Sequence, residues 1–204
     1  VSDFKKGDKV YCRLPIDKIG AFAEYAAVDQ KYVAKMPENY DFATAAAIPL
    51  TGLTAYQAIT EELDTMPGDT LLIPGGSGQM AVPIARAMGL GVIVTGNERA
   101  KQQFLDMGVE RYLDYKKENY WEVLSDVDHV IDTLGASEFD RELSVLKKGG
   151  RLVSLRTGPN KESAVRNNYH FIKKRFFPWL VLSMIRQPGK RARNTDLCSY
   201  EPAA

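Results

Sequence analysis

The chain has 204 residues, 45% of them hydrophobic and 26% charged, which is enough for one complete α/β domain and part of a second. Its 27 basic and 26 acidic residues give a formal charge of +1, so no net field favours nucleic acid or an anionic membrane as a partner. The longest apolar run, 176–185, falls short of the roughly 18 residues that cross a bilayer. With Pro178 inside it, this run predicts a buried or lid helix.

The two ends of the sequence and its cysteines bear on cellular context. Cys12 and Cys198 are the only cysteines and lie far apart in the sequence, so a disulfide framework is not expected and a cytoplasmic location is. The first residues contain no starting Met and no apolar signal core, and they lead directly into a turn and a strand. We therefore expect the sequence to be a segment of a longer protein.

The first 64 residues predict short strands followed by helices. Residues 9–13 and 21–28 alternate apolar with small or polar side chains, as paired strands do. Asp41 can cap a helix that should end before Pro49. Apolar residues then recur at helical spacing over 51–63, which predicts a second helix packed on a larger body.

From Thr70 onward the pattern changes to strands that alternate with helices. The strands are continuous apolar runs, which is typical of a parallel sheet buried on both faces. We predict an α/β fold with a Rossmann-type doubly wound parallel sheet. The expected strands are 71–73, 92–95, 111–113, 129–132 and 151–155, and the expected helices are 81–88, 99–107, 120–124 and 138–146.

Beyond Gly158 the sequence is harder to interpret. Residues 161–187 combine a basic patch with aromatic residues, and we expect a helical or lid segment there. Residues 188–204 show no periodicity and predict an irregular tail.

A glycine-rich turn after the first strand of this sheet carries the main functional signal. Read from Gly76, the sequence is G-x-G-x-x-A, after a predicted strand and before a predicted helix, as a dinucleotide fingerprint requires. Gly76 permits a tight turn, Gly78 lets the backbone approach a pyrophosphate, and Ala81 keeps the helix near the sheet. A flexible connecting turn is the alternative. The predicted phosphate-binding residues are Gly75, Gly76, Ser77, Gly78, Gln79 and Met80.

The end of the second strand indicates which cofactor is preferred. Enzymes that use NAD place Asp or Glu here, whereas Arg or Lys accommodates the 2′-phosphate of NADP. The chain has Asn97, Arg99 and Lys101, which favour NADPH over NADH, although Glu98 complicates this interpretation. Alternatively, Arg99 and Lys101 only solvate a helix.

Several segments, in order, resemble the medium-chain dehydrogenase/reductases, specifically the zinc-free quinone oxidoreductase branch. They are residues 20–25, 49–56, the loop at Gly76, 132–135 and 148–153. The resemblance implies a partial GroES-like β domain over 1–40, connecting helices over 41–64 and a Rossmann domain over 65–160. The nicotinamide would lie in the cleft between the two domains.

The same resemblance assigns further contacts and a quaternary structure. Thr133, Leu134 and Gly135 would border the nicotinamide, Ser154 and Leu155 would follow it, and Tyr115 would lie by the adenosine phosphate. A late edge strand of the sheet pairs subunits in this family, which implies a homodimer. The chain lacks the family's opening strands and closing segment. Its Gln79 and Met80 replace a usual Gly-Val pair and Ala81 replaces a common Gly, so we expect a bulkier loop and weaker binding.

The sequence offers few metal ligands. Catalytic zinc needs three protein ligands and structural zinc usually four. Only Cys12, Cys198, His129 and His170 are available among cysteines and histidines, so we expect no metal and a structural role for His129.

Together these features predict zinc-independent reduction of a small carbonyl compound or quinone by NADPH. A reductase without a metal must orient the acceptor and stabilise the oxyanion through hydrogen-bond donors. Tyr56 and Thr51 are candidate donors, although helix packing or capping is the more common role for such residues. Three alternatives are a non-catalytic nucleotide-binding or scaffold protein, a relative of zinc-type alcohol dehydrogenases, and a methyltransferase. A methyltransferase would be expected to have an acidic residue where Thr95, Gly96 and Asn97 stand.

Overall fold

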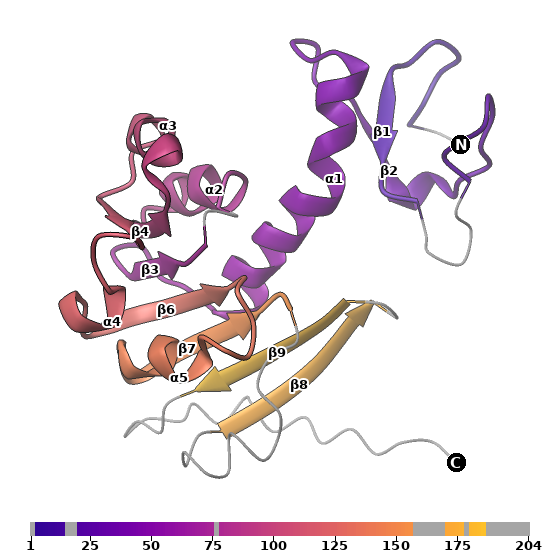
Figure 1. Cartoon of the computed structure of the whole chain (residues 1–204). Coiled ribbons are helices and arrows are strands. Elements are labelled where there is room, and N and C mark those ends of the chain that lie inside the picture. Colours follow the sequence, from indigo (N-terminus) through magenta and orange to yellow (C-terminus); the bar gives the residue numbers. More distant parts are fainter. Residues whose placement is uncertain (1–2, 15–19, 76–77, 157–169, 178–179, 187–204) are drawn as a thin grey trace, which may run out of the picture.

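The computed structural model describes residues 3–14, 20–75, 78–156, 170–177 and 180–186. A two-stranded sheet and a larger sheet lie on opposite sides of one long helix (Figure 1). In the small sheet β1 (Val10–Cys12) pairs antiparallel with β2 (Val33–Lys35), which follows the 3-10 turn η2 (Gln30–Tyr32). The described helices include none that is long and apolar enough to cross a membrane.

The strand predicted over 21–28 does not form. Phe22 and Tyr25 are almost fully exposed, so the alternation in this stretch covers no apolar surface. Because a strand needs both a hydrogen-bonded neighbour and a face to bury, the alternation alone was not sufficient. β2 occupies the position beside β1 instead.

One helix, α1 (Phe42–Gln57), replaces the two that were predicted around Pro49, and it continues as the π-helical segment η3 (Ala58–Glu62). The predicted cap is confirmed, because Asp41 Oδ1 accepts from Thr44 N at 2.7 Å. The predicted break before Pro49 is wrong. An internal proline costs about 3 kcal/mol locally, but Pro49 belongs to a buried stripe, and tertiary packing of that stripe stabilises the continuous helix. The stripe consists of Ala45, Pro49, Gly52 and Ala55.

The predicted doubly wound sheet is confirmed. Five parallel strands lie in the order β5-β4-β3-β6-β7. They are β3 (Thr70–Ile73), β4 (Gly91–Gly96), β5 (Arg111–Asp114), β6 (Val127–Asp132) and β7 (Leu146–Ser154). Connecting them are α2 (Ala81–Ala87), η4 (Glu98–Ala100), α3 (Lys101–Asp106), α4 (Tyr120–Val123) and α5 (Phe139–Ser144).

Two apolar clusters cover the two faces of this sheet. One joins the buried side of α1, α2 and α3 to the sheet and includes the fully buried Ile59, Leu71 and Val94. The other joins α4 and α5 to the opposite face and includes Leu72 and Val130. Burial on both faces explains why β3 and β4 are largely apolar runs in the sequence.

The sheet continues through two strands where a helical or lid segment over 161–187 was predicted. β9 (Leu180–Arg186) pairs antiparallel with β7, and β8 (His170–Phe177) pairs antiparallel with β9. The helical prediction is therefore wrong for both ranges. The sequence here is rich in aromatic and branched residues, which favour strands, and β7 offers a free edge to pair with. The predicted tail, 188–204, lies outside the described residues.

The topology creates a crevice at one edge of the sheet. From β3 the chain proceeds through β4 to β5 on one side, and then returns to place β6 and β7 on the other. The carboxyl ends of β3 and β6 therefore diverge into loops that leave in opposite directions. Doubly wound sheets bind ligands at such a point, and α1 approaches the same region (Figure 1).

Candidate functional site

The loop after β3 is built around a glycine that no other residue can replace without movement. Gly75 has φ +87°, a backbone conformation that favours glycine. A Cβ at this position would collide with Leu134 Cδ2 and lie 3.1 Å from Thr133 Oγ1. The backbone thus lies directly against the turn after β6. Gly76 and Ser77, the next predicted phosphate-binding residues, lie outside the described residues.

Two hydrogen bonds fix this loop to its neighbouring strands. Gly75 N donates to Thr95 Oγ1 at 3.1 Å, and Thr133 Oγ1 donates to the carbonyl oxygen of Pro74 at 2.7 Å. The first bond reaches β4 and the second reaches the residue after β6. The loop is therefore held from both sides of the crevice.

The helix and the sheet approach each other closely at Gly78, whereas the prediction assigned this packing to Ala81. A Cβ there would lie 3.2 Å from Val82 Cγ2 and 3.3 Å from Ile73 Cγ2, so a larger residue would push α2 away from β3. Val82 N donates to Gly78 O at 2.8 Å as the first turn begins. Met80, the N-cap residue, makes no side-chain hydrogen bond to the start of the helix.

Buried hydrogen bonds shape the turn after β6. Asp132 is fully buried, and its Oδ1 accepts from Leu134 N at 2.7 Å and from Gly135 N at 2.8 Å. Its Oδ2 accepts from Ser154 Oγ at 2.6 Å. The main chain of the predicted nicotinamide-contacting residues is consequently set by one carboxylate. Ser154 is fully buried with its hydroxyl directed at Asp132, whereas Leu155 faces the cavity described below.

A second carboxyl group lies behind Asp132. Glu142, on α5, is fully buried, and neither of its carboxyl oxygens has a hydrogen-bond partner among the described residues. Burial, and after it the negative charge of Asp132, raises the pKa of Glu142 to about 9. Glu142 is therefore neutral at pH 7, which avoids placing a second negative charge in this part of the core.

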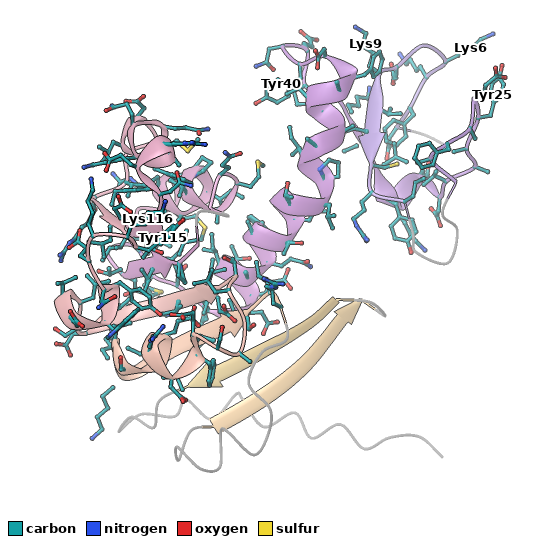
Figure 2. All side chains as sticks on the ribbon, in the orientation of Figure 1. Lys6, Lys9, Tyr25, Tyr40, Tyr115 and Lys116 are labelled. Atoms are coloured by element: carbon teal, nitrogen blue, oxygen red, sulfur yellow. The ribbon has the colours of Figure 1, made fainter. Side chains whose placement is uncertain are left out.

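A cavity of about 760 Å³ lies between α1, the start of α2 and the carboxyl ends of the strands. Its wall from the sheet side consists of Ile73, Ile131, Thr133 and Leu155, and the loop side adds Gln79 and Met80. The long wall is one face of α1, where Thr44, Ile48, Thr51 and Thr54 recur at helical spacing. Tyr40, which lines its outer part, lies at the N-terminal end of α1 (Figure 2).

Of the two predicted hydroxyl donors, the structure brings one to the cavity. Thr51 lines it, but its hydroxyl donates to the carbonyl oxygen of Ala47 at 2.9 Å. Tyr56 is 52% exposed and does not belong to the lining. Sequence reasoning missed Thr54, which lines the cavity one turn further along α1. The signal was available, because Thr44, Thr51 and Thr54 share one helical face.

Met80 narrows the gap between the loop and α1. A Cβ at Gly52 would lie 3.4 Å from Met80 Cε, so the Met80 side chain extends onto α1 where the helix has no side chain. The predicted bulk of this loop thus has a definite position. Its predicted effect on binding strength stays a prediction.

At the far end of the crevice lie the residues predicted to read the adenosine phosphate. Asn97 Oδ1 accepts from Ala100 N at 3.3 Å, which caps η4. Arg99 and Lys101 are exposed and form no ion pair within the part of the chain that the structure describes. Tyr115 is 55% exposed and lies beside Lys116 on the sheet body (Figure 2).

Sequence reasoning also missed an ion pair at this end. Lys117 Nζ contacts Glu98 and lies 3.7 Å from Asp114 Oδ2. Residues 19 positions apart in the sequence give no local signal of a contact, although both follow predicted strands that are neighbours in a Rossmann sheet.

The described residues that were considered as metal ligands do not lie together. His129 is buried, its Nε2 lies 3.0 Å from Asp69 Oδ2, and burial lowers the pKa of its imidazole. It lies near the start of β6, at the opposite edge from the crevice. Cys12 is a free thiol, and Cys198 lies outside the described residues. Within the described ranges no three His, Cys, Asp or Glu side chains are grouped so that they could hold a metal ion.

The described residues fit a dinucleotide. Gly75 and Gly78 leave main chain where side chains would otherwise stand, and the turn at Thr133, Leu134 and Gly135 is fixed beside the loop. Basic side chains follow the end of β4, and none of them lines the apolar cavity. A phosphate-bearing half and a ring-bearing half can thus occupy chemically different ends of one crevice.

Comparisons with known proteins agree with this geometry. The model of the family described as zinc-binding dehydrogenase matches residues 76–177, half of the chain. A quinone oxidoreductase of Homo sapiens is 33% identical over 162 residues, covering 74% of this chain and 49% of the relative. An NADPH-dependent alkenal/one oxidoreductase of Arabidopsis thaliana is 30% identical over 188 residues, covering 85% of this chain and 48% of the relative.

Among solved structures, the Escherichia coli quinone oxidoreductase complexed with NADPH superposes with a TM-score of 0.64 at 28% identity. The match covers 74% of this chain and 48% of that chain. The chain spans about half the length of the curated relatives it matches. The chain belongs to the zinc-binding dehydrogenase family, in the quinone oxidoreductase-like branch of the medium-chain dehydrogenase/reductases.

Proposed function

We propose that this protein is a zinc-independent reductase that uses NADPH to transfer a hydride to a quinone or an α,β-unsaturated carbonyl compound. One observation carries the proposal: the apolar cavity opens at the turn that the glycine loop contacts. Thr133 lines the cavity and donates to Pro74 in that loop, so an acceptor in the cavity and a nucleotide on the loop would be neighbours.

In the proposed complex, the loop at 75–80 and the turn at 133–135 hold the cofactor, with Leu155 beside it. When bound, the cofactor supplies the hydride. The chain supplies position: Asp132 fixes the amides of Leu134 and Gly135 before any ligand arrives. Preorganised backbone of this kind lowers the barrier because less ordering is required during the reaction.

The chemistry of the cavity favours a neutral, conjugated acceptor. Among the described lining residues there is no Asp, Glu, Lys, Arg or His, so neither an anionic nor a cationic substrate would find a countercharge. Hydride addition places negative charge on the acceptor oxygen, and a conjugated system spreads that charge. The Thr54 hydroxyl, on the cavity side of α1, is our candidate hydrogen-bond donor to this oxygen.

The relatives support the same substrate class. The human protein is named a quinone oxidoreductase and the Arabidopsis protein an NADPH-dependent alkenal/one oxidoreductase. The Escherichia coli quinone oxidoreductase was solved in complex with NADPH. These names describe the relatives, and they are the reason we propose NADPH in preference to NADH for this chain.

A fluorescence titration with NADPH and NADH, followed by a quinone-dependent NADPH oxidation assay, tests the proposal. We expect binding of NADPH with a lower Kd than that of NADH, and oxidation that requires the quinone. Absence of binding by either nucleotide contradicts the proposal. Binding without turnover supports a non-catalytic nucleotide-binding protein instead.

Three further expectations belong to this proposal. We propose that residues 1–40 contribute to a substrate domain and residues 65–160 to a dinucleotide-binding domain.

A homodimer would form through β8, which is the last strand of the sheet order and has one unpaired edge among the described strands. Light scattering on the purified protein tests the homodimer. A cytoplasmic location fits the free thiol of Cys12.

A further inference from the structure

The segments that follow β4 and β5 are joined into one surface. Tyr112 on β5 donates from its hydroxyl to the carbonyl oxygen of Asn97 at 2.7 Å, passing Gly96, where any Cβ would collide with the Tyr112 oxygen. Tyr115 N donates to Gly96 O at 3.2 Å. Residues just beyond the two strands therefore have fixed neighbours across the strand boundary.

Glu98 occupies an unfavourable position for a cofactor with a 2′-phosphate. It lies two residues after β4, where an acidic side chain typically binds the ribose hydroxyls of NAD. A carboxylate there would repel a 2′-phosphate bound beside it, because two negative charges a few ångströms apart repel each other even in water. Taken alone, Glu98 contradicts the preference for NADPH.

Lys117 changes this charge balance. Its ammonium contacts Glu98, and that contact raises the pKa of Lys117, so the ammonium stays charged at neutral pH. The backbone of the segment is held independently of the side chain, because Lys117 N donates to Asp114 O at 2.9 Å and Lys116 N donates to Asp114 Oδ1 at 3.0 Å. Lys117 is thus positioned to cancel the charge of Glu98.

Glu98 and Asp114 stand against four basic side chains, those of Arg99, Lys101, Lys116 and Lys117, so the surface is net positive. Arg99 and Lys101 form no ion pair with any described residue, and Lys116 on the adjacent strand end also forms none. The Glu98 and Lys117 side chains are 57% and 67% exposed, so the pair contributes little to stability, and changing it leaves the fold intact.

We propose that Lys117 determines the preference for the 2′-phosphorylated cofactor by neutralising Glu98, so that Arg99, Lys101 and Lys116 act on the phosphate without opposition. This inference rests on the proposed use of NADPH. In this arrangement Lys117 works through Glu98 and need not touch the ligand.

A double-mutant cycle with nucleotide fragments tests the inference without relying on catalysis. We would measure Kd by calorimetry for adenosine 2′,5′-bisphosphate and for adenosine 5′-phosphate, with the wild type, Lys117→Met, Glu98→Gln and the double variant. The control is Lys148→Met, which removes one exposed charge within β7, away from this surface. Thermal unfolding verifies that each variant is folded.

We expect Lys117→Met to raise the Kd for the bisphosphate about fivefold to tenfold and the Kd for the monophosphate less than about twofold. Glu98→Gln should not weaken the bisphosphate, and the double variant should return to within about twofold of the wild type. Lys148→Met should change the Kd for neither ligand by more than about twofold.

Two results overturn the inference while leaving the proposed function intact. In the first, Lys117→Met binds both fragments as the wild type does, which removes any role for the pair. In the second, the double variant is as weak as Lys117→Met, which means that Lys117 contacts the phosphate directly. If the wild type binds neither fragment nor NADPH, the proposed function fails as well.

Discussion

The two ends of the crevice are held by different kinds of interaction. After β6, the turn at 133–135 is fixed by Asp132 and Ser154, both fully buried. After β4, the surface at Glu98 depends on a more than half-exposed ion pair with Lys117. Buried polar networks are costly to change, whereas exposed pairs contribute little energy. The end proposed for the reacting ring is therefore rigid, and the end proposed for the adenosine phosphate is open to adjustment.

If this contrast is correct, the largest effect should come from the titration of Glu142. Its folded-state pKa of about 9 lies above the ordinary glutamate value of 4.5, so the stability it contributes is complete below pH 4.5 and is lost as pH rises towards about 9. The loss is about 1.4 kcal/mol per pH unit, or about 4 kcal/mol between pH 5 and 8. Urea unfolding across this range measures it.

The matched variant is Glu142→Gln, which keeps the shape of the side chain without the titrating group. Its unfolding free energy should change much less with pH than that of the wild type. If the unfolding free energies of the two proteins changed in parallel with pH, Glu142 would not titrate in the core.

Removing the carboxylate of Asp132 should have the next largest effect. Asp132→Ala leaves the amides of Leu134 and Gly135 and the hydroxyl of Ser154 without their acceptor, and should cost about 3 kcal/mol of unfolding free energy. Ser154→Ala removes one of these bonds and should cost about 1 kcal/mol. Equal losses in the two variants, measured by urea unfolding, would contradict a network organised around Asp132.

The glycine loop provides a sharper test because the chain contains a matched control. Gly75 and Gly149 have φ values of +87° and +88°, so alanine introduces similar backbone strain at either position. Only at Gly75 would the new Cβ meet Leu134, since Gly149 has no atom within 4 Å. Gly75→Ala should weaken NADPH at least about tenfold. If Gly149→Ala weakened NADPH binding by a similar factor, backbone strain alone would explain the effect.

The smallest effect concerns the α1 wall of the cavity. Thr54→Val removes our candidate donor, the hydroxyl of a residue that lines the cavity, whereas Thr51→Val removes a hydroxyl that already donates to Ala47. We expect kcat/KM for a quinone to fall about fivefold in Thr54→Val and less than about twofold in Thr51→Val, with unchanged Kd for NADPH. Equal kcat/KM values in the two variants would remove Thr54 as a donor.

The sequence was most informative where burial is complete. β3, β4 and β5 were predicted to within one residue at each end, and β3 and β4 show the apolar runs of strands covered on both faces. β6 and β7 begin earlier than predicted, where their sequences contain charged residues. Prediction failed where a local pattern competed with a distant contact. Pro49 continues a helix because the helical stripe to which it belongs is buried, and residues 180–186 form a strand because β7 provides an edge.

The candidate site residues divide in the same way. Gly75, Gly78 and the turn at 133–135 were predictable because glycine patterns and a family resemblance mark backbone geometry. Glu142 was not, since a glutamate on a short helix looks like any exposed one in the sequence. The pairing of Glu98 with Lys117 was not either, because only the strand order makes the two neighbours.

The long wall of the cavity comes from a single helix, and this separates two properties of the protein. α1 contributes Thr44, Ile48, Thr51 and Thr54 to the cavity and no residue to the glycine loop. On the proposed function, substitutions along that helical face would change the size and polarity of the acceptor that fits, while the proposed nucleotide site stays as it is. Substrate range can therefore diversify among descendants of this chain without a new cofactor site having to arise.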